Sequence, residues 1–137
     1  MYAALFDAAA KVRELIMVLE LHLELVAREL YVQAFFGGKV SEERLAFVRK
    51  QLPKGVVAFA KLAAFKPFVA GEHFSLADCA AGMHLPLISS ACKRVLGEDL
   101  LAALPVKAYM AHIDARPSMA RVNADRKANS QEMAALM

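Results

Sequence analysis

The sequence contains no tryptophan, only two cysteines, six glycines and five prolines in 137 residues. Scarce glycine and proline leave few turn and breaker positions, so long regular elements are expected rather than a loop-rich or disordered chain. Hydrophobic residues make up 58% of the chain, above the roughly 45–50% of an average soluble domain. Length and composition therefore predict one domain, residues 1–137, with a sizeable core and some apolar surface for another protein part to cover.

The cysteines and histidines argue against disulfide and metal chemistry. Cys79 and Cys92 are thirteen residues apart on one expected helix, so at about 1.5 Å per residue they lie roughly 20 Å apart and cannot pair. We expect reduced thiols, with Cys79 a small buried side chain rather than a nucleophile. The four histidines lack metal-ligand spacing, so no metal is expected. His84 is expected as a hydrogen-bonded core residue, with a pocket-lining imidazole as the alternative.

Membranes and nucleic acids are not indicated as partners. The sequence has no charge-free run of 18 apolar residues and no recognisable leader, so neither membrane spanning nor export is predicted and a cytoplasmic location is expected. Residues 37–66 carry seven basic and two acidic residues, but the clustered arginines and interleaved aromatics of nucleic-acid binders are missing. We interpret this surplus as a solvated basic helix face.

Helical periodicity dominates the first third of the chain and predicts one helix from about Ala4 to Phe36. Its core stripe repeats at steps of three and four: Val12, Ile16, Leu19, Leu23, Val26 and Leu30. A second apolar stripe lies on the opposite side: Val18, Leu21, Leu25 and Val32. A polar arc lies between the stripes: Arg13, Glu20, Glu24, Arg28 and Tyr31. We infer that the second stripe meets another domain or subunit; alternatively, further helices of the same bundle cover it.

Breakers and caps divide the rest of the chain into helices. Gly37 and Gly38 end the first helix, and Ser41 begins a second that runs to about Phe65. Pro53 inside it predicts a kink or short break. A loop is expected at 66–73, followed by a central helix that bends near Pro86 and ends at Gly97. Two further helices are expected, from about 105 to 115 and from 117 onward, with residues 123–132 fraying. No strand pattern occurs, so the predicted fold is all-α, a bundle of about five helices.

The stretch FSLAD, residues 74–78, marks the start of the central helix. Ser75 is the expected N-cap and Asp78 the third helical residue, which together form a capping box with Asp in place of Glu. Phe74 and Cys79 have the spacing of a hydrophobic staple. Because the helix is apolar nearly all round, water cannot reach its free N-terminal amides, and we expect Ser75 and Asp78 to serve structure rather than catalysis.

The segment PFVAGEHFSLADCA, residues 68–81, resembles the most recognisable block of the cytosolic glutathione transferase (glutathione S-transferase) family, where it opens the central helix of the all-helical C-terminal domain. Leu104 and Pro105, Tyr109, and the run at 115–118 (ARPS) resemble a second block of that family. The resemblance extends over nearly the whole chain. It implies the all-helical fold, a thioredoxin-like partner domain that is absent from this chain, and a homodimer in the complete protein.

The resemblance also implies a function. A complete enzyme would conjugate glutathione, its co-substrate, to an electrophile, with glutathione held mainly on the thioredoxin-like domain. We therefore expect no catalytic residue and no cofactor in this chain, and no activity from the chain alone. The helical domain would supply a hydrophobic co-substrate pocket, for which Arg28, Glu29 and Tyr31 are the candidates; alternatively they are surface residues with an Arg–Glu pair. The alternative function is a non-catalytic interaction or assembly module of the same fold.

Overall fold

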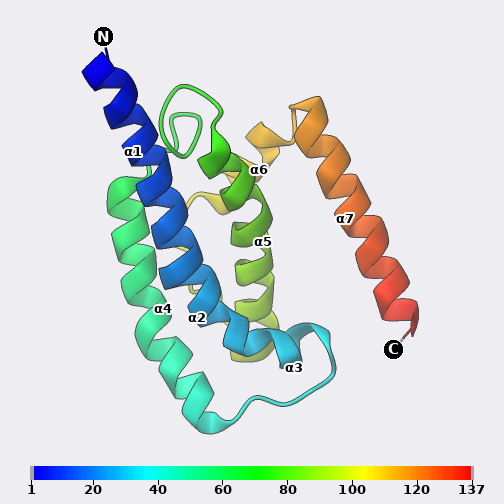
Figure 1. The fold of residues 1–137 in the computed structure, drawn as a ribbon. Helices are drawn as coiled ribbons and strands as arrows, with labels where there is room; N and C mark the ends of the chain where they lie inside the picture. Colours follow the sequence, from blue (N-terminus) through cyan, green and yellow to red (C-terminus); the bar gives the residue numbers. More distant parts are fainter. Residues whose placement is uncertain (1, 137) are drawn as a thin grey trace.

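The computed structural model describes residues 2–136, which form five helical rods (Figure 1). The first rod, called the first helix below, is continuous but not uniform. It consists of α1 (Tyr2–Val18), the π-helical segment η1 (Leu19–Glu24), α2 (Leu25–Ala27), the 3₁₀ segment η2 (Arg28–Leu30) and α3 (Tyr31–Phe35). The others are α4 (Glu42–Leu62), α5 (Leu76–Leu96), α6 (Val106–Ile113) and α7 (Pro117–Leu136). The predicted all-α fold is confirmed, and no strand forms within the described residues.

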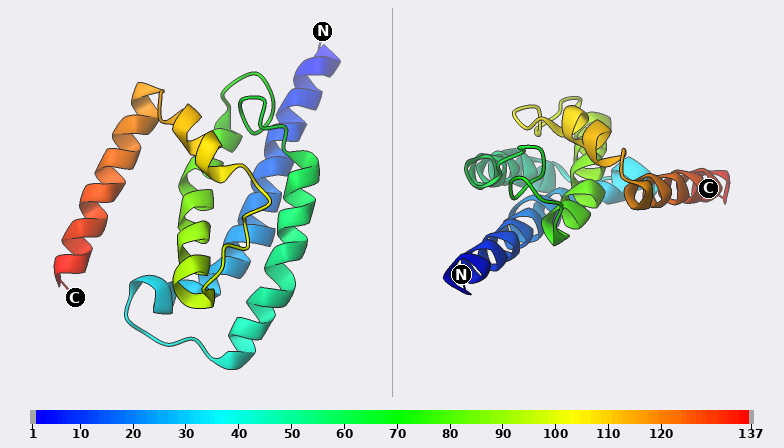
Figure 2. Two further views of the ribbon diagram at one scale, coloured as in Figure 1. Left: turned by 180° about the vertical axis from the view of Figure 1, so that it is seen from behind. Right: turned by 90° about the horizontal axis from the view of Figure 1, so that it is seen from above.

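The first helix lies between α4 and α5 and contacts both. In Figure 1, α4 runs alongside it in the opposite direction, while α5 runs in the same direction. The short α6 packs against α5. The view from above in Figure 2 shows α7 pointing away from the other helices, and of its residues only Met119 is buried.

The core face of the first helix differs from the predicted stripe. Its buried hydrophobic residues are Leu15, Leu19, Leu23, Ala27, Leu30 and Ala34. Val12, Ile16 and Val26, predicted for the core, are only partly buried at its edge. Three successive steps of four residues would drift by about 120° around an ideal α-helix. The wider turn of η1 absorbs part of this drift, which is why 15, 19, 23 and 27 can share one face.

The π-helical segment coincides with the closest approach of α4. A Cβ atom added at Gly55 would lie 2.2 Å from the carbonyl oxygen of His22 and 2.9 Å from its carbonyl carbon. The backbones of α4 and η1 are therefore in direct contact, which only a residue without a side chain permits.

The predictions for α4 hold except at its proline and its end. The side chain of Ser41 accepts a hydrogen bond from the Arg44 amide at 3.4 Å and caps the helix. The inner face of α4 is buried at Val48, Leu52, Val56 and Phe59. Of the kink or short break predicted at Pro53, the break does not occur: α4 continues through Pro53, because the buried residues on both sides hold the helix where one backbone hydrogen bond is missing. The helix ends at Leu62, three residues before the predicted Phe65.

The start of α5 contains the capping box expected from FSLAD. Asp78 is fully buried and accepts hydrogen bonds from the Ser75 amide at 2.9 Å, the Val69 amide at 2.9 Å and the Tyr109 hydroxyl at 2.8 Å. The Ser75 hydroxyl accepts from the Ala77 amide at 3.2 Å. One carboxylate thus joins the 66–74 loop, α5 and α6.

Two predictions near the start of α5 need correction or refinement. Cys79 is exposed, not buried, because Ala77 and Asp78 face inward and the next residue is turned about 100° further round the helix. Phe74 packs against Phe68, with ring centroids 5.7 Å apart, and under Arg116, whose guanidinium lies 4.0 Å from the ring centre.

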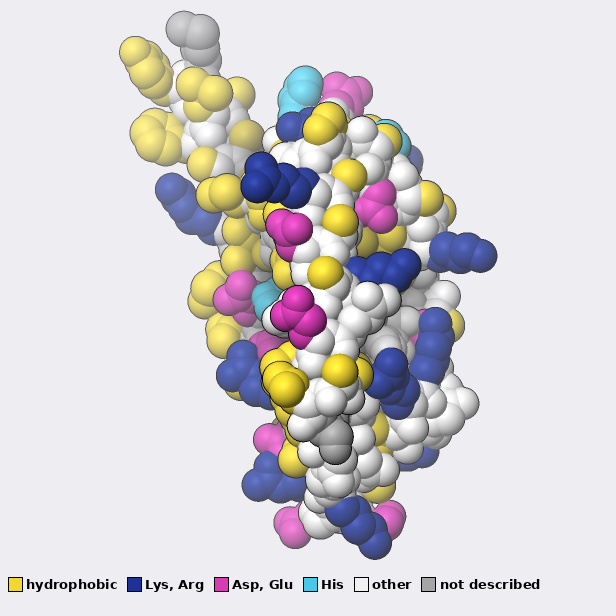
Figure 3. Space-filling model, turned by 90° about the vertical axis from the view of Figure 1, so that its right-hand side faces the viewer, with side chains coloured by type: hydrophobic (Ala, Val, Ile, Leu, Met, Phe, Trp, Pro, Cys, Tyr) yellow, Lys and Arg dark blue, Asp and Glu magenta, His cyan; other side chains and the backbone are white. Residues whose placement is uncertain are grey.

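The last helix is longer than expected. The polar stretch 123–132 was predicted to fray, but α7 is helical from Pro117 to Leu136. Alanine, arginine, lysine, glutamine, glutamate and methionine dominate it, and these residues favour the helix without any packing. Polarity therefore set its exposure, visible in the charged side chains in front in Figure 3, and not its conformation.

Candidate functional site

The predicted pocket residues lie near the C-terminal end of the first helix. Arg28 and Glu29 belong to the 3₁₀ segment η2, and both line an open groove of about 410 Å³ between this end and the start of α4. We call it the Arg28 groove. Its other lining residues are Val32, Lys39, Val40, Ser41 and Arg44.

Arg28 is held by a buried carboxylate on the preceding turn. Its Nε and Nη2 atoms donate to the two oxygens of Glu24, four residues earlier in the helix, at 3.0 and 2.7 Å. The Glu24 side chain is only 8% exposed, whereas that of Arg28 is 61% exposed. The hydrogen bond to Glu24 and its charge raise the pKa of Arg28. Because Nη1 is not used in this pair, Arg28 is fixed in direction while still able to bind a carboxylate from solution.

Glu29 faces the other side of the groove, where its carboxylate forms an ion pair with Arg44 of α4. This pair joins the end of the first helix to the first turn of α4. Glu29 is thereby neutralised by Arg44, and the groove keeps Lys39 and Arg28, the latter paired with Glu24 through Nε and Nη2.

Tyr31 does not line the Arg28 groove. It is half-buried beside Phe35, with ring centroids 5.6 Å apart. Its hydroxyl is buried and has no hydrogen-bond partner within residues 2–136. Burial, followed by the charge of Glu24, raises the pKa of Tyr31 above its usual range. The structure therefore brings Arg28 and Glu29 together and leaves Tyr31 outside their groove.

His84 lies at the edge of the core and not inside it. Its side chain is 26% exposed, and its Nε2 atom is 3.5 Å from a carboxylate oxygen of Glu20 in the π-helical segment. Glu20, Glu24 and Arg28 thus form a polar row along the side of the first helix. In the part of the chain that the structure describes, no three His, Cys, Asp or Glu side chains are grouped as metal ligands would be.

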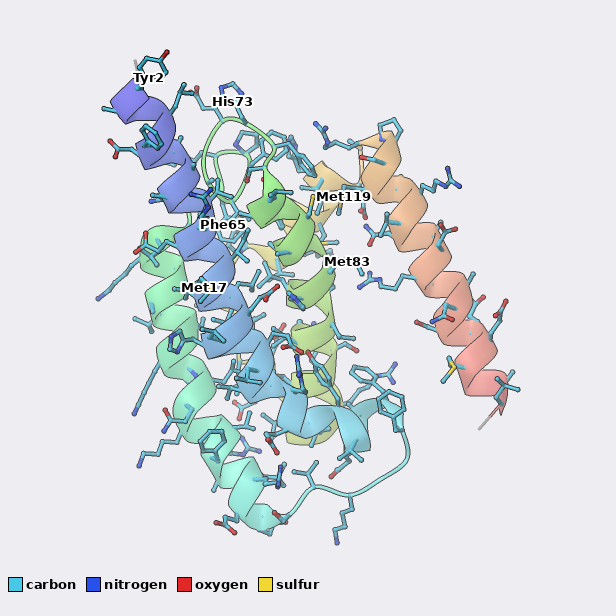
Figure 4. All side chains as sticks on the ribbon, viewed as in Figure 1. Tyr2, Met17, Phe65, His73, Met83 and Met119 are labelled. Carbon is cyan, nitrogen blue, oxygen red and sulfur yellow. The ribbon has the colours of Figure 1, made fainter. Side chains whose placement is uncertain are left out.

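Exposed apolar side chains occupy other parts of the first helix. Leu21, Leu25 and Val32 of the second stripe are 45%, 49% and 46% exposed, so helices of the bundle do not cover them as the alternative interpretation required. Val18 is the exception, being partly buried against the core. The N-terminal turns of α1 project beyond the bundle with Tyr2 at their end (Figure 4), and hydrophobic side chains gather on them at the upper left of Figure 3.

Comparison with known proteins identifies the family. Residues 3–112 match the profile described as the glutathione S-transferase, C-terminal domain. The chain belongs to this family. It is also 38% identical over 121 residues to a glutathione S-transferase of Pseudomonas putida. That match covers 88% of this chain but 55% of the relative, so the chain spans about half the length of this curated relative.

Membership in the glutathione S-transferase family confirms the resemblance drawn from residues 68–81 and 104–118. The match covers 55% of the P. putida protein, so about 45% of the length of that protein lies outside the match. That part of the relative has no counterpart among the residues that leave the second stripe exposed. Within residues 2–136, no helix has the length and apolar character needed to cross a bilayer.

One feature of the site was missed from the sequence, namely the burial of the Glu24 carboxylate. The i, i+4 spacing to Arg28 was visible, but it is equally common on exposed helix faces. Burial of Glu24 follows from the π-helical turn, for which the sequence offers no clear signal apart from apolar residues repeating at steps of four.

Proposed function

We propose that this chain is the co-substrate-binding half of a glutathione transferase. In the complete enzyme a thioredoxin-like domain binds glutathione, and the thiolate of glutathione attacks an electrophile held against the helical domain. The sulfur–carbon bond forms as the leaving group departs or, in an addition, as the electrophile accepts the electron pair. No residue of this chain is assigned to activating the thiol.

The observation that carries this proposal is the exposed stripe of Leu21, Leu25 and Val32. These side chains are nearly half exposed on a helix whose opposite face is fully buried, an arrangement that disfavours a free surface and favours a partner. The uncovered 45% of the P. putida relative is long enough to be that partner domain.

We place the co-substrate site beside this stripe, in the Arg28 groove, where Arg28 is the charged group that meets the ligand. Glu24 orients the guanidinium, and the exposed Nη1 is free to bind an anionic group of glutathione or of the acceptor. Glu29 holds Arg44 and positions the groove. Tyr31 contributes at most its ring edge, because its hydroxyl is buried.

The proposal includes a homodimer in the cytoplasm. Tyr2, Leu5 and Phe6 are 75%, 65% and 71% exposed on the projecting turns of α1, which gives a second apolar surface for a subunit contact. The two cysteines are free thiols, as expected in a reducing compartment. Sedimentation of the complete protein tests the dimer: Phe6→Glu should shift it toward monomer, and an unshifted dimer would remove this surface from the proposal.

The first experiment is calorimetry of the chain with glutathione. We expect no measurable heat of binding, since the glutathione-binding domain is not part of this chain. Stoichiometric binding with a micromolar Kd would refute the division of labour between the two domains.

In the second experiment, this chain is fused to the segment of the P. putida relative that lies outside the match, which supplies the proposed glutathione-binding domain. The fusion should conjugate glutathione to a chromogenic aryl halide, and Leu21→Glu with Leu25→Glu should abolish this by separating the domains. Val57→Glu on α4 is the control, because Val57 is similarly exposed at 56%. A fusion whose two domains pack stably against each other but which stays inactive would favour the alternative function, a non-catalytic interaction module.

A further inference from the structure

The outer face of α4 lies at the edge of the bundle. In Figure 1, α4 forms one side of the molecule, and the view from above in Figure 2 shows no helix beyond it on that side. The opposite, inner face of α4 holds Leu52, which is fully buried. At about 100° per residue, the exposed Lys50, Lys54 and Lys61 lie roughly 160°, 200° and 180° around α4 from Leu52. They form one line about 17 Å long on the outermost side of the helix, which we call the lysine face.

The positive charge of the lysine face is not compensated within the chain. Its three lysines take part in no ion pair among residues 2–136. The two arginines of α4 differ in this respect, since Arg44 pairs with Glu29 and Arg49 pairs with Glu98. Both acidic residues of α4 are in its first turn, and the nearer one, Glu43, is about 10 Å along the helix from the first lysine. The lysine face is therefore open to carboxylates from outside.

Two exposed apolar side chains flank the lysine face. Phe47 is 49% exposed and Val57 is 56% exposed. By the same angular step they lie roughly 220° and 140° around α4 from Leu52, so each is on a different side of the line of lysines. In protein interfaces, apolar side chains of this kind supply hydrophobic contact, and charges select the partner and its orientation. The outer face of α4 combines both.

The charge and shape of this face distinguish between partners. A second copy of the chain would place lysines against lysines, and like charges oppose association. A helix that binds a membrane surface buries a continuous apolar face in the lipid, whereas the continuous apolar face of α4 is buried in the core. An acidic α-helix fits, because carboxylates at i, i+4 and i+11 lie on one side of a helix and repeat at the same 1.5 Å rise as the lysines.

We infer that the outer face of α4 docks an acidic α-helix of another protein. The carboxylates of that helix lie against the three lysines, and apolar side chains beside them cover Phe47 and Val57. This surface is on a different helix from the second stripe, where the proposed glutathione-binding domain packs, and from the projecting turns of α1. Docking at α4 therefore leaves the proposed conjugation reaction unchanged, and its test does not depend on that reaction.

The probe is a synthetic fluorescein-labelled helical peptide with glutamates at i, i+4 and i+11, leucines at i−3 and i+7, and alanine or glutamine elsewhere. This spacing copies that of the lysines and apolar residues of α4. Titrated with the full chain and followed by fluorescence anisotropy, the peptide should bind saturably, and binding should weaken with added salt because exposed charges are screened. The same peptide with glutamine in place of glutamate should bind about tenfold more weakly or less.

Two double variants locate the bound peptide. Lys50→Glu with Lys54→Glu should weaken binding by about tenfold or more, because two attractions become repulsions at the same distance. Arg121→Glu with Lys127→Glu makes the same charge change on α7, where both side chains are exposed, and should leave the affinity unchanged within about twofold. Circular dichroism verifies that both variants fold.

A matched pair of variants tests the apolar contact. Phe47→Ala should weaken peptide binding by about threefold or more, because the ring loses its buried contact. Phe36→Ala, which removes a ring that is 60% exposed just after α3, should not change it. Equal affinities of these two variants would overturn the docking geometry.

Three other results would overturn the proposal. Equal weakening by the two double variants would reduce the interaction to net charge. Equal binding of the glutamate and glutamine peptides would remove the recognition of carboxylates. Sedimentation of the chain with phosphatidylglycerol vesicles, lost in Lys50→Glu with Lys54→Glu and without peptide binding, would assign the face to a lipid surface.

Discussion

Replacement of Gly55 by alanine tests the direct contact between the backbones of α4 and η1. Alanine in place of glycine inside a helix normally stabilises it by about 1 kcal/mol. Here the new Cβ would lie 2.2 Å from the His22 carbonyl oxygen, whereas ordinary contact begins near 3.4 Å, so the helices must separate by about 1.2 Å. Backbone atoms cannot rotate away, and separating packed helices loosens the core around Leu19 and Leu23. We expect the overpacking cost to exceed the helix gain, for a net loss of about 2 kcal/mol or more.

Gly82→Ala is the matched control. Gly82 also lies within a helix, and its new Cβ would meet the Met119 Cε atom at 2.7 Å and the Ile113 Cδ1 atom at 2.8 Å. Both are the ends of flexible side chains that can change rotamer, so this variant should stay within about 1 kcal/mol of the parent.

Urea unfolding followed by circular dichroism measures both variants. With a slope of about 2 kcal/mol per molar urea, Gly55→Ala should lower the midpoint by about 1 M, and Gly82→Ala by less than half of that. A Gly55→Ala protein as stable as the parent would refute the backbone contact. Equal decreases of the urea midpoint in both variants would show that the added methyl group destabilises the fold by its volume alone, whether it meets backbone or flexible side chains.

Three further predictions concern the capping network and the thiols. Asp78→Ala should cost about 3–5 kcal/mol in urea unfolding, because it leaves the buried Val69 amide and Tyr109 hydroxyl without an acceptor; an unchanged midpoint would contradict the network. Burial, and then Asp78, raises the pKa of Tyr109 above its ordinary 10.0. The protonated hydroxyl therefore stabilises the fold fully below pH 10, and this stabilisation is lost as the pH rises above 10, where the unfolded chain releases the proton first. In Tyr109→Phe the free energy of unfolding should fall less steeply with alkaline pH, by up to about 1.4 kcal/mol per pH unit. A thiol reagent should modify one cysteine per native chain and two after unfolding, because Cys79 is exposed while burial raises the pKa of Cys92 to about 11; two fast-reacting thiols in the native chain would be inconsistent with the fold.

Much of the fold was predictable because it depends on local chemistry. Ser41, Ser75 and Gly97 mark helix ends through capping and left-handed geometry that any fold would need. The exposed second stripe followed from periodicity alone. Pro53 shows the limit of such rules, since tertiary packing on both sides kept α4 continuous where the local preference predicted a kink or a short break.

The candidate site was less predictable because helical phase was assumed to be constant. Each residue was placed at 100° from the last, yet η1 is wider and η2 narrower than an α-helix, so residues between 19 and 30 do not all lie on the face that a constant step predicts. Glu24 accordingly turned out to be buried and Tyr31 to lie outside the groove of Arg28 and Glu29. Cys79 and His84 were misplaced for a different reason: apolar neighbours in sequence do not show which side of a helix meets solvent.

The wide turn at η1 also bears on how the first helix can vary among relatives. A π-helical turn accommodates one extra residue in an otherwise regular helix, so removing a single residue between 19 and 24 would restore regular winding and leave the residues that follow on nearly the same faces. Arg28 would then keep its place at the groove, and Ala34 would keep its place in the core. A relative with a one-residue gap in this segment can therefore present the same side chains at this groove as the present chain does.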